Sequence, residues 1–133
     1  AGLNLIEIQQ SSNLNLVNRG MVTEQFVGQH LLYSLPFYQE PELHYWSREK
    51  PTASSEVDYV IAEAGRIVPI EVKSGAGGKL KSLDVFSQEK KHPYAIRFNS
   101  ELPLTFTLPS GCKVFSIPLY LAGQTRRLIQ KLV

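Results

Sequence analysis

Two carboxylates and an amine near the centre of this sequence are the residues best placed to do chemistry together. Asp58 lies in the apolar stretch 56–62, and Glu71 and Lys73 lie at the end of the apolar stretch 67–73. Two carboxylates held close together either share a proton or bind a cation. Mg²⁺ is bound by one or two carboxylates with carbonyl oxygen and water, and a nearby amine could stabilise negative charge or orient an attacking water. These residues therefore predict a metal site suited to hydrolysis.

A hairpin would bring the two carboxylates together. The stretches 56–62 and 67–73 are joined by a short Gly-containing segment at 63–66, which predicts two antiparallel strands. Pairing across that turn places Asp58 close to Glu71 on the partner strand. Like charges placed opposite each other destabilise a sheet pair, so a bound cation explains the arrangement better than chance does.

Strand alternation decides which side chains share a face. Glu71 and Lys73 are two residues apart and project together, whereas Pro69 lacks a ladder donor and indicates an edge strand or a bulge. In the preceding strand, alternation separates Asp58 from a group that shares the other face: Val57, Tyr59 and Ile61. The alternative is that Asp58 is a half-exposed surface charge and that Glu71 and Lys73 form an ordinary surface ion pair.

The stretch 18–35 is the strongest helix in the sequence. Its apolar residues recur at helical spacing, and Glu24 falls on the same face as Val27, Gly28 and Leu31. Gly28 would allow the helix to approach the sheet closely. Glu24 is therefore a fourth member of the predicted site, although a carboxylate is also favourable near the N-terminal end of any helix.

The remaining periodic segments predict an α/β fold, a mixed β-sheet flanked by helices. A helix between 67–73 and the next strand allows a parallel crossover at that point. The other predicted elements are a strand at 43–47, a helix at 79–92, strands at 94–98 and 113–118, and a helix from 124 to the C-terminus.

Length and composition agree with a single domain over residues 1–133. No run of apolar residues is long enough to span a membrane, and the N-terminus lacks the pattern of a secretory signal. The only cysteine, Cys112, is expected to be a buried apolar residue in a protein of the cytoplasm. The formal net charge of +2 is mild. Basic residues do cluster after the central stretch, on helix faces or on a phosphate-tracking surface: Lys79, Lys81, Lys90, Lys91 and Arg97.

Other candidate sites are weaker. The segment SGAGGK at 74–79 fails as an ATP-binding P-loop, because Leu80 follows Lys79 where Ser or Thr is required. Its backbone amides and Lys79 could still contact a DNA phosphate, or the segment could be a plain connector. Tyr45 and Trp46 could stack on bases, but core packing is the better prediction.

Several blocks of the sequence resemble known families. The order of Glu24, Asp58 and the Glu71-Val72-Lys73 element resembles the PD-(D/E)XK nuclease superfamily, which has the restriction-endonuclease-like fold. A narrower resemblance is to the C-terminal domain of unknown function of prokaryotic AAA+ family ATPases. It is carried by the blocks GMVTEQFVGQHLL, LHYWS, SSEVDYVIA and VPIEVKSGAGGKLKSL.

The resemblance implies roles for these residues. Asp58 and Glu71 would bind Mg²⁺ or Mn²⁺, with the carbonyl of Val72 as a third ligand. Lys73 would activate water or stabilise the transition state, and Glu24 would be an auxiliary acid. The nucleic acid would be contacted by a further set of side chains: Lys79, Lys81 and Gln88.

The expected function is therefore a metal-dependent nuclease that hydrolyses phosphodiester bonds of DNA. The alternative is a non-catalytic accessory domain that binds DNA or protein. In either case the resemblance implies an N-terminal ATPase module in a longer protein, and the mild net charge favours the accessory role.

Overall fold

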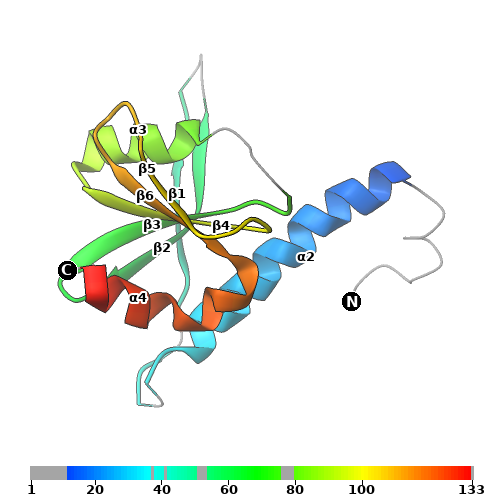
Figure 1. The fold of residues 1–133 in the computed structure, drawn as a ribbon, viewed down its shortest axis with the longest axis horizontal. Coiled ribbons are helices and arrows are strands. Elements are labelled where there is room, and N and C mark those ends of the chain that lie inside the picture. Colours follow the sequence, from blue (N-terminus) through cyan, green and yellow to red (C-terminus); the bar gives the residue numbers. More distant parts are fainter. Residues whose placement is uncertain (1–11, 37, 41, 51–53, 76–79, 133) are drawn as a thin grey trace.

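The computed structural model describes residues 12–36, 38–40, 42–50, 54–75 and 80–132. It confirms the predicted α/β fold, with a six-stranded mixed sheet flanked by helices (Figure 1). In chain order the elements are α2 (Ser12–Tyr33), β1 (His44–Arg48), β2 (Ser55–Glu63), β3 (Arg66–Val72), α3 (Lys81–Lys90), β4 (Tyr94–Asn99), β5 (Leu104–Thr107), β6 (Lys113–Pro118), the 3-10 helix η1 (Leu119–Gln124) and α4 (Thr125–Leu132). None of the helices in this described part is long and apolar enough to cross a membrane.

The strand order in the sheet is β1-β2-β3-β4-β6-β5. Strands β2 and β3 form the predicted antiparallel hairpin, and Tyr59 pairs with Ile70 in the register expected from the turn. Strand β4 pairs with β3 and with β6 in parallel, so the chain crosses over through α3 as predicted. The carboxyl ends of three parallel strands therefore meet at one edge of the sheet.

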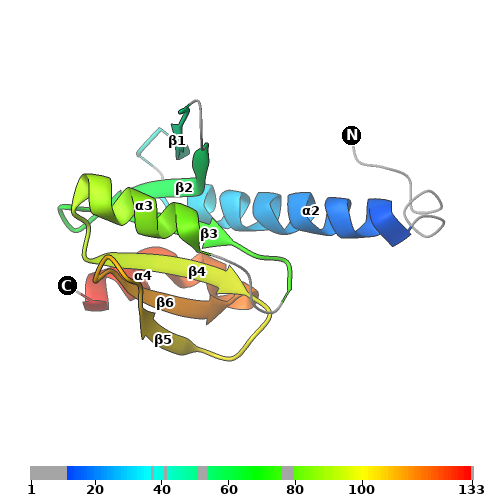
Figure 2. The same cartoon turned by 90° about the horizontal axis from the view of Figure 1, so that it is seen from above.

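One strand was not predicted, and one predicted helix is longer than expected. Strand β5 has only four residues, lies at the edge of the sheet and is largely exposed, so its sequence lacks a clear apolar face. It is a strand because it pairs antiparallel with β6. Helix α2 begins at Ser12, six residues before the predicted start, and its first half projects beyond the sheet (Figure 2).

Pro69 lies in the middle of the sheet and is fully buried, so the edge position that its type indicated is wrong. It pairs with Val60 on the antiparallel side. On the parallel side the register with β4 begins at Ile70, one residue later. The missing donor of Pro69 therefore lies just outside the β3–β4 ladder, which explains why a central strand tolerates it.

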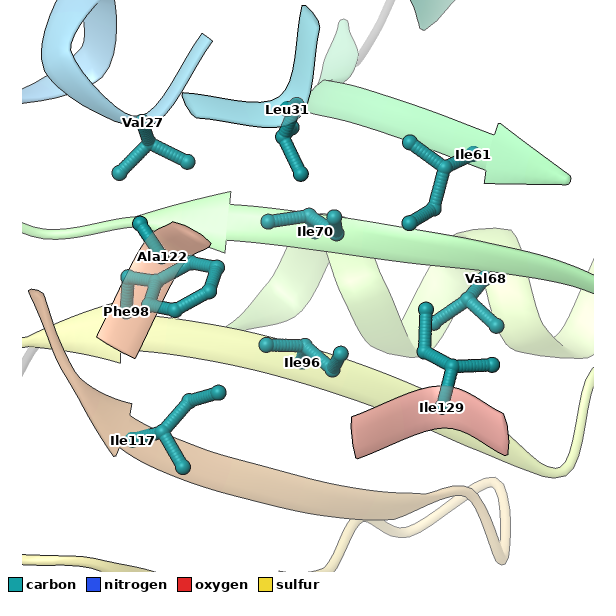
Figure 3. Close-up of a cluster of buried hydrophobic side chains, with 10 residues drawn as sticks. All are labelled: Val27, Leu31, Ile61, Val68, Ile70, Ile96, Phe98, Ile117, Ala122 and Ile129. Carbon is teal, nitrogen blue, oxygen red and sulfur yellow. The ribbon is translucent and has the colours of Figure 1, made fainter. Parts of the chain in front are cut away.

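Helices α2 and α4 cover one face of the sheet, and α3 covers the other (Figures 1 and 2). The core beneath α2 and α4 is drawn in Figure 3 and consists of Val27, Leu31, Ile61, Val68, Ile70, Ile96, Phe98, Ile117, Ala122 and Ile129. The core beneath α3 consists of Val57, Leu80, Leu83, Phe86, Ala95, Cys112 and Val114. Cys112 is thus a buried apolar residue, as predicted.

Strand β2 changes face at the position of Asp58. His44 of β1 pairs with Val60, whereas Trp46 pairs with Val57, so two steps along β1 oppose three steps along β2. This irregularity is a β-bulge, and it places Val57 and Val60 together beneath α3. The prediction that Val57 shares a face with Tyr59 was therefore wrong, because strict alternation does not survive a bulge.

Candidate active site

Asp58 lies where β2 and β3 separate. The hairpin pairing ends at Tyr59 and Ile70. Beyond this pair, the Val72 amide donates a hydrogen bond to Asp58 Oδ2 at 2.7 Å. The carboxylate thus occupies the position of a ladder acceptor and reaches across to β3. Burial raises the pKa of Asp58, while the Val72 amide and the charge of Lys73 act in the opposite direction.

Glu71 is a buried acid with one oxygen that has no partner. The residue is 8% exposed, and the Lys73 amine donates to Oε1 at 2.9 Å. The other oxygen, Oε2, is buried and has no hydrogen-bond partner among the described residues. Burial, and then the charge of Asp58, raise the pKa of Glu71 to about 7 although Lys73 opposes the shift. The structure therefore brings Asp58, Glu71 and Lys73 together.

Glu24 approaches this group from α2. It lies one turn before the buried residues Val27 and Gly28, on the face predicted from its spacing. Burial raises the pKa of Glu24, and the charges of Asp58 and Glu56 raise it further. All four predicted catalytic side chains therefore interact electrostatically.

Tyr59 fixes the position of α2 and was not identified from the sequence. Its hydroxyl donates a hydrogen bond to the backbone carbonyl of Glu24 at 2.9 Å. Its ring fills the space beside Gly28, where an added Cβ would lie 2.5 Å from the Tyr59 hydroxyl oxygen. The close helix–sheet approach predicted for Gly28 is confirmed, and Tyr59 is the residue that receives it.

Replacing Gly28 with alanine is expected to lower the free energy of unfolding by about 1 kcal/mol. The clash with Tyr59 destabilises the folded protein by about 1–3 kcal/mol. The higher helix propensity of alanine stabilises it by about 1 kcal/mol. Gly20 is the matched control, because it lies in the same helix with nothing within 4 Å of an added Cβ. Gly20→Ala should stabilise the protein in the same urea titration. Equal effects of the two variants would contradict the contact with Tyr59.

A cavity of about 230 Å³ opens beside Asp58. It is lined by Glu24, Leu43, His44, Tyr45, Glu56, Val57, Asp58 and Tyr59. Glu56, for which the sequence indicated no role, thus adds a third carboxylate. Tyr45 is 74% exposed, so the prediction of core packing was wrong for this residue. The prediction was right for Trp46, whose ring packs edge-on against Phe86 beneath α3.

Of the predicted nucleic-acid contacts, Gln88 is not brought together with the acids. Lys81 is the exposed first residue of α3, and Lys79 lies outside the described residues. Gln88 is exposed and lines a different depression, together with His92 and Cys112. Of the three predicted residues, Gln88 therefore belongs to a region separate from the cavity beside Asp58.

The donor set fits a divalent cation held by two carboxylates. The charge of Asp58 raises the pKa of Glu71, and Oε2 of Glu71 has no partner in the described structure. A cation would satisfy both conditions, since Mg²⁺ takes one or two carboxylates and completes its shell with carbonyl oxygen and water. Among the residues described, no group of three or more His, Cys, Asp or Glu side chains could hold a metal. The carbonyl of Val72 remains the predicted third protein ligand.

One family model matches most of the chain. It is described as a domain of unknown function, DUF4143, and it covers residues 19–120, from within α2 to within η1. The curated proteins and the solved structures contain no significant match to the chain.

Proposed function

The chain belongs to the DUF4143 family, and because that family is described only as a domain of unknown function, we propose a function from the site itself. We propose that the domain is a metal-dependent nuclease of the PD-(D/E)XK type, which hydrolyses phosphodiester bonds of DNA. The observation that carries the proposal is the buried oxygen of Glu71 that no described residue bonds, next to the Asp58 carboxylate and the Lys73 amine. A purely structural ion pair would not need the second acid.

Asp58 and Glu71 would hold Mg²⁺ or Mn²⁺, together with the carbonyl of Val72. The ion would lower the pKa of a bound water and polarise a phosphoryl oxygen. Asp58 is oriented for this role because the Val72 amide holds its Oδ2 in place through a hydrogen bond. Glu71 is oriented by Lys73 in the same way.

Lys73 would stabilise negative charge on the phosphate. Its ammonium group is 2.9 Å from Glu71 Oε1 and is only partly exposed, so its charge acts in a partly desolvated environment. Glu24 lines the cavity beside Asp58, and its raised pKa makes it a better proton carrier than an ordinary glutamate. These two residues supply the charge and the proton that hydrolysis requires.

A cleavage assay on plasmid DNA tests this function. The wild-type protein should nick or linearise DNA with Mg²⁺ or Mn²⁺ but not with EDTA, and Asp58→Ala should lose this activity. Cleavage that persists in Asp58→Ala would indicate a contaminating nuclease. If the wild-type protein cleaves no DNA with either metal, the nuclease proposal is wrong.

A non-catalytic accessory role has its own supporting observation. Three apolar side chains on α2 are 40–62% exposed, which suits contact with protein rather than DNA: Met21, Val22 and Phe26. The N-terminal ATPase module remains a prediction from the resemblance, and a location in the cytoplasm remains a prediction from the single cysteine. If the metal site proves silent in the cleavage assay, the accessory role becomes the preferred function.

A further inference from the structure

A row of polar side chains crosses the sheet on the face that α3 covers. Glu71, Arg97 and Ser116 lie side by side on β3, β4 and β6, because Arg97 is in register with both of the others. They are 8%, 6% and 1% exposed. Ala95 and Val114, two residues before Arg97 and Ser116, belong to the apolar core beneath α3. The row thus begins where that core ends and continues the proposed active site across the sheet.

Arg97 is a buried cation for which the described residues supply no anionic partner. Its Nε donates to the hydroxyl of Ser116 at 3.0 Å, and its guanidinium lies 5.0 Å from the centre of the Phe106 ring. Within the described part of the chain no carboxylate forms an ion pair with Arg97. Charged side chains are almost never buried unless they are paired. The Ser116 hydroxyl and the Phe106 ring do not replace the hydration that Arg97 loses on burial. The described residues therefore leave room for an anion beside Arg97.

Asn99 lies on the same face as Arg97, and its side-chain amide has a donor that no described residue satisfies. It follows Arg97 by two residues and is fully buried. Its Oδ1 accepts a hydrogen bond from the Glu101 amide at 3.3 Å, whereas Nδ2 has no partner among the described residues. Because the Lys73 amide bonds to the carbonyl of Phe98, Lys73 leaves β3 next to Asn99. The carboxyl ends of β3 and β4 thus hold an amine, a guanidinium and an amide.

We propose that Arg97 and Asn99 bind a phosphate group of the nucleic acid beside the Glu71–Lys73 pair. A guanidinium matches the geometry of a phosphate with two parallel hydrogen bonds, and such charge-assisted bonds are strong. The phosphate would neutralise Arg97 and accept a hydrogen bond from Asn99 Nδ2. That the phosphate belongs to nucleic acid rests on the proposed nuclease function, whereas the need for an anion rests on Arg97 itself.

Binding without metal tests this site. Short duplex DNA and inorganic phosphate are titrated separately in EDTA at low salt, with fluorescence anisotropy for DNA and the melting temperature for both ligands. The wild-type protein should bind DNA, and Arg97→Met should weaken binding by about tenfold or more. Arg66→Met is the matched control, because Arg66 also stacks on a ring (Tyr94, 5.4 Å) but lies at the other end of β3. It should change the affinity by about twofold at most.

A second variant separates binding from folding. Asn99→Asp retains the acceptor for the Glu101 amide and places a carboxylate two residues from Arg97 on the same face. It should melt no lower than the wild type without ligand, since it supplies the missing anion, yet lose DNA binding as Arg97→Met does. A purely structural role would instead lower the melting temperature of Arg97→Met and leave the DNA affinity of folded Asn99→Asp unchanged. That result would overturn the proposal.

The outcomes for the phosphate site and for the nuclease can be told apart. Binding that depends on Arg97 without any metal-dependent cleavage would support the phosphate site and reject the nuclease. Cleavage by the wild type together with unaltered DNA binding by Arg97→Met would support the nuclease and reject the phosphate site. If inorganic phosphate raises the melting temperature through Arg97 but DNA does not bind, the site takes a free anion and the assignment to nucleic acid is wrong.

Discussion

Replacing Lys73 with methionine is expected to slow metal-dependent DNA cleavage by about 10²- to 10³-fold, the usual effect of removing one group that stabilises transition-state charge. Methionine keeps most of the side-chain volume and removes only the ammonium group, which lies 2.9 Å from Glu71 Oε1. The loss should appear in the single-turnover rate constant at saturating protein. Protein binding to DNA in EDTA should fall far less, because one partly exposed charge among many contributes little.

Metal binding distinguishes this role of Lys73 from a structural one. The ammonium group and a divalent cation compete for the same carboxylate, so Lys73→Met should bind Mn²⁺ at least as tightly as the wild type in a calorimetric titration. Lys113→Met is a matched control, since Lys113 is the exposed first residue of β6 and its amine lies over the Phe115 ring. That variant should cleave at the wild-type rate. Joint loss of cleavage and Mn²⁺ binding in Lys73→Met would show that Lys73 supports the fold of the site instead.

The hairpin and its register could be predicted from the sequence because both depend on local features. The turn length fixes the pairing, and the pairing carries Asp58 to the end of β3 beside Glu71. The bulge in β2 could not be predicted in this way. The bulge depends on how β1 pairs with β2, and a polar loop of no regular period separates these two strands in the sequence. Strict alternation predicted that Asp58 and Glu71 meet because they share a face of the sheet. In the structure, Asp58 instead reaches β3 within the sheet.

Arg97 shows a second limit of the sequence. Among the basic residues after the central stretch it was grouped with lysines that are exposed on α3, such as Lys81 and Lys90. The strand pattern of 94–98 does place Arg97 on the face opposite Ile96 and Phe98. Whether that face is solvated or buried depends on the helix that covers it, which only the tertiary structure shows. The buried polar row of Glu71, Arg97 and Ser116 was therefore missed.

The largest effect on stability is expected for Glu71→Gln, and it should depend on pH. In the folded protein the pKa of Glu71 is raised from 4.5 to about 7, so the folded state binds this proton more tightly than the unfolded chain does. The stability that this proton provides is complete below pH 4.5 and is lost as the pH rises through 7. The full loss corresponds to roughly 3 kcal/mol. Glutamine carries no charge at any pH, so the variant escapes this loss.

Urea titrations should therefore show that, as the pH rises from 4.5 to 8, the free energy of unfolding of Glu71→Gln increases relative to that of the wild type by up to roughly 3 kcal/mol. Glu101→Gln, at an exposed position after β4, should follow the wild type over this range. Saturating Mg²⁺ at pH 8 should raise the stability of the wild type and reduce the difference, because the cation then neutralises the carboxylate that glutamine removes. A constant difference between Glu71→Gln and the wild type across this pH range would show that Glu71 is already ionised at pH 4.5. The two acids would then form an ordinary ion-pair network with Lys73, and the strain that the cation is expected to relieve would not exist.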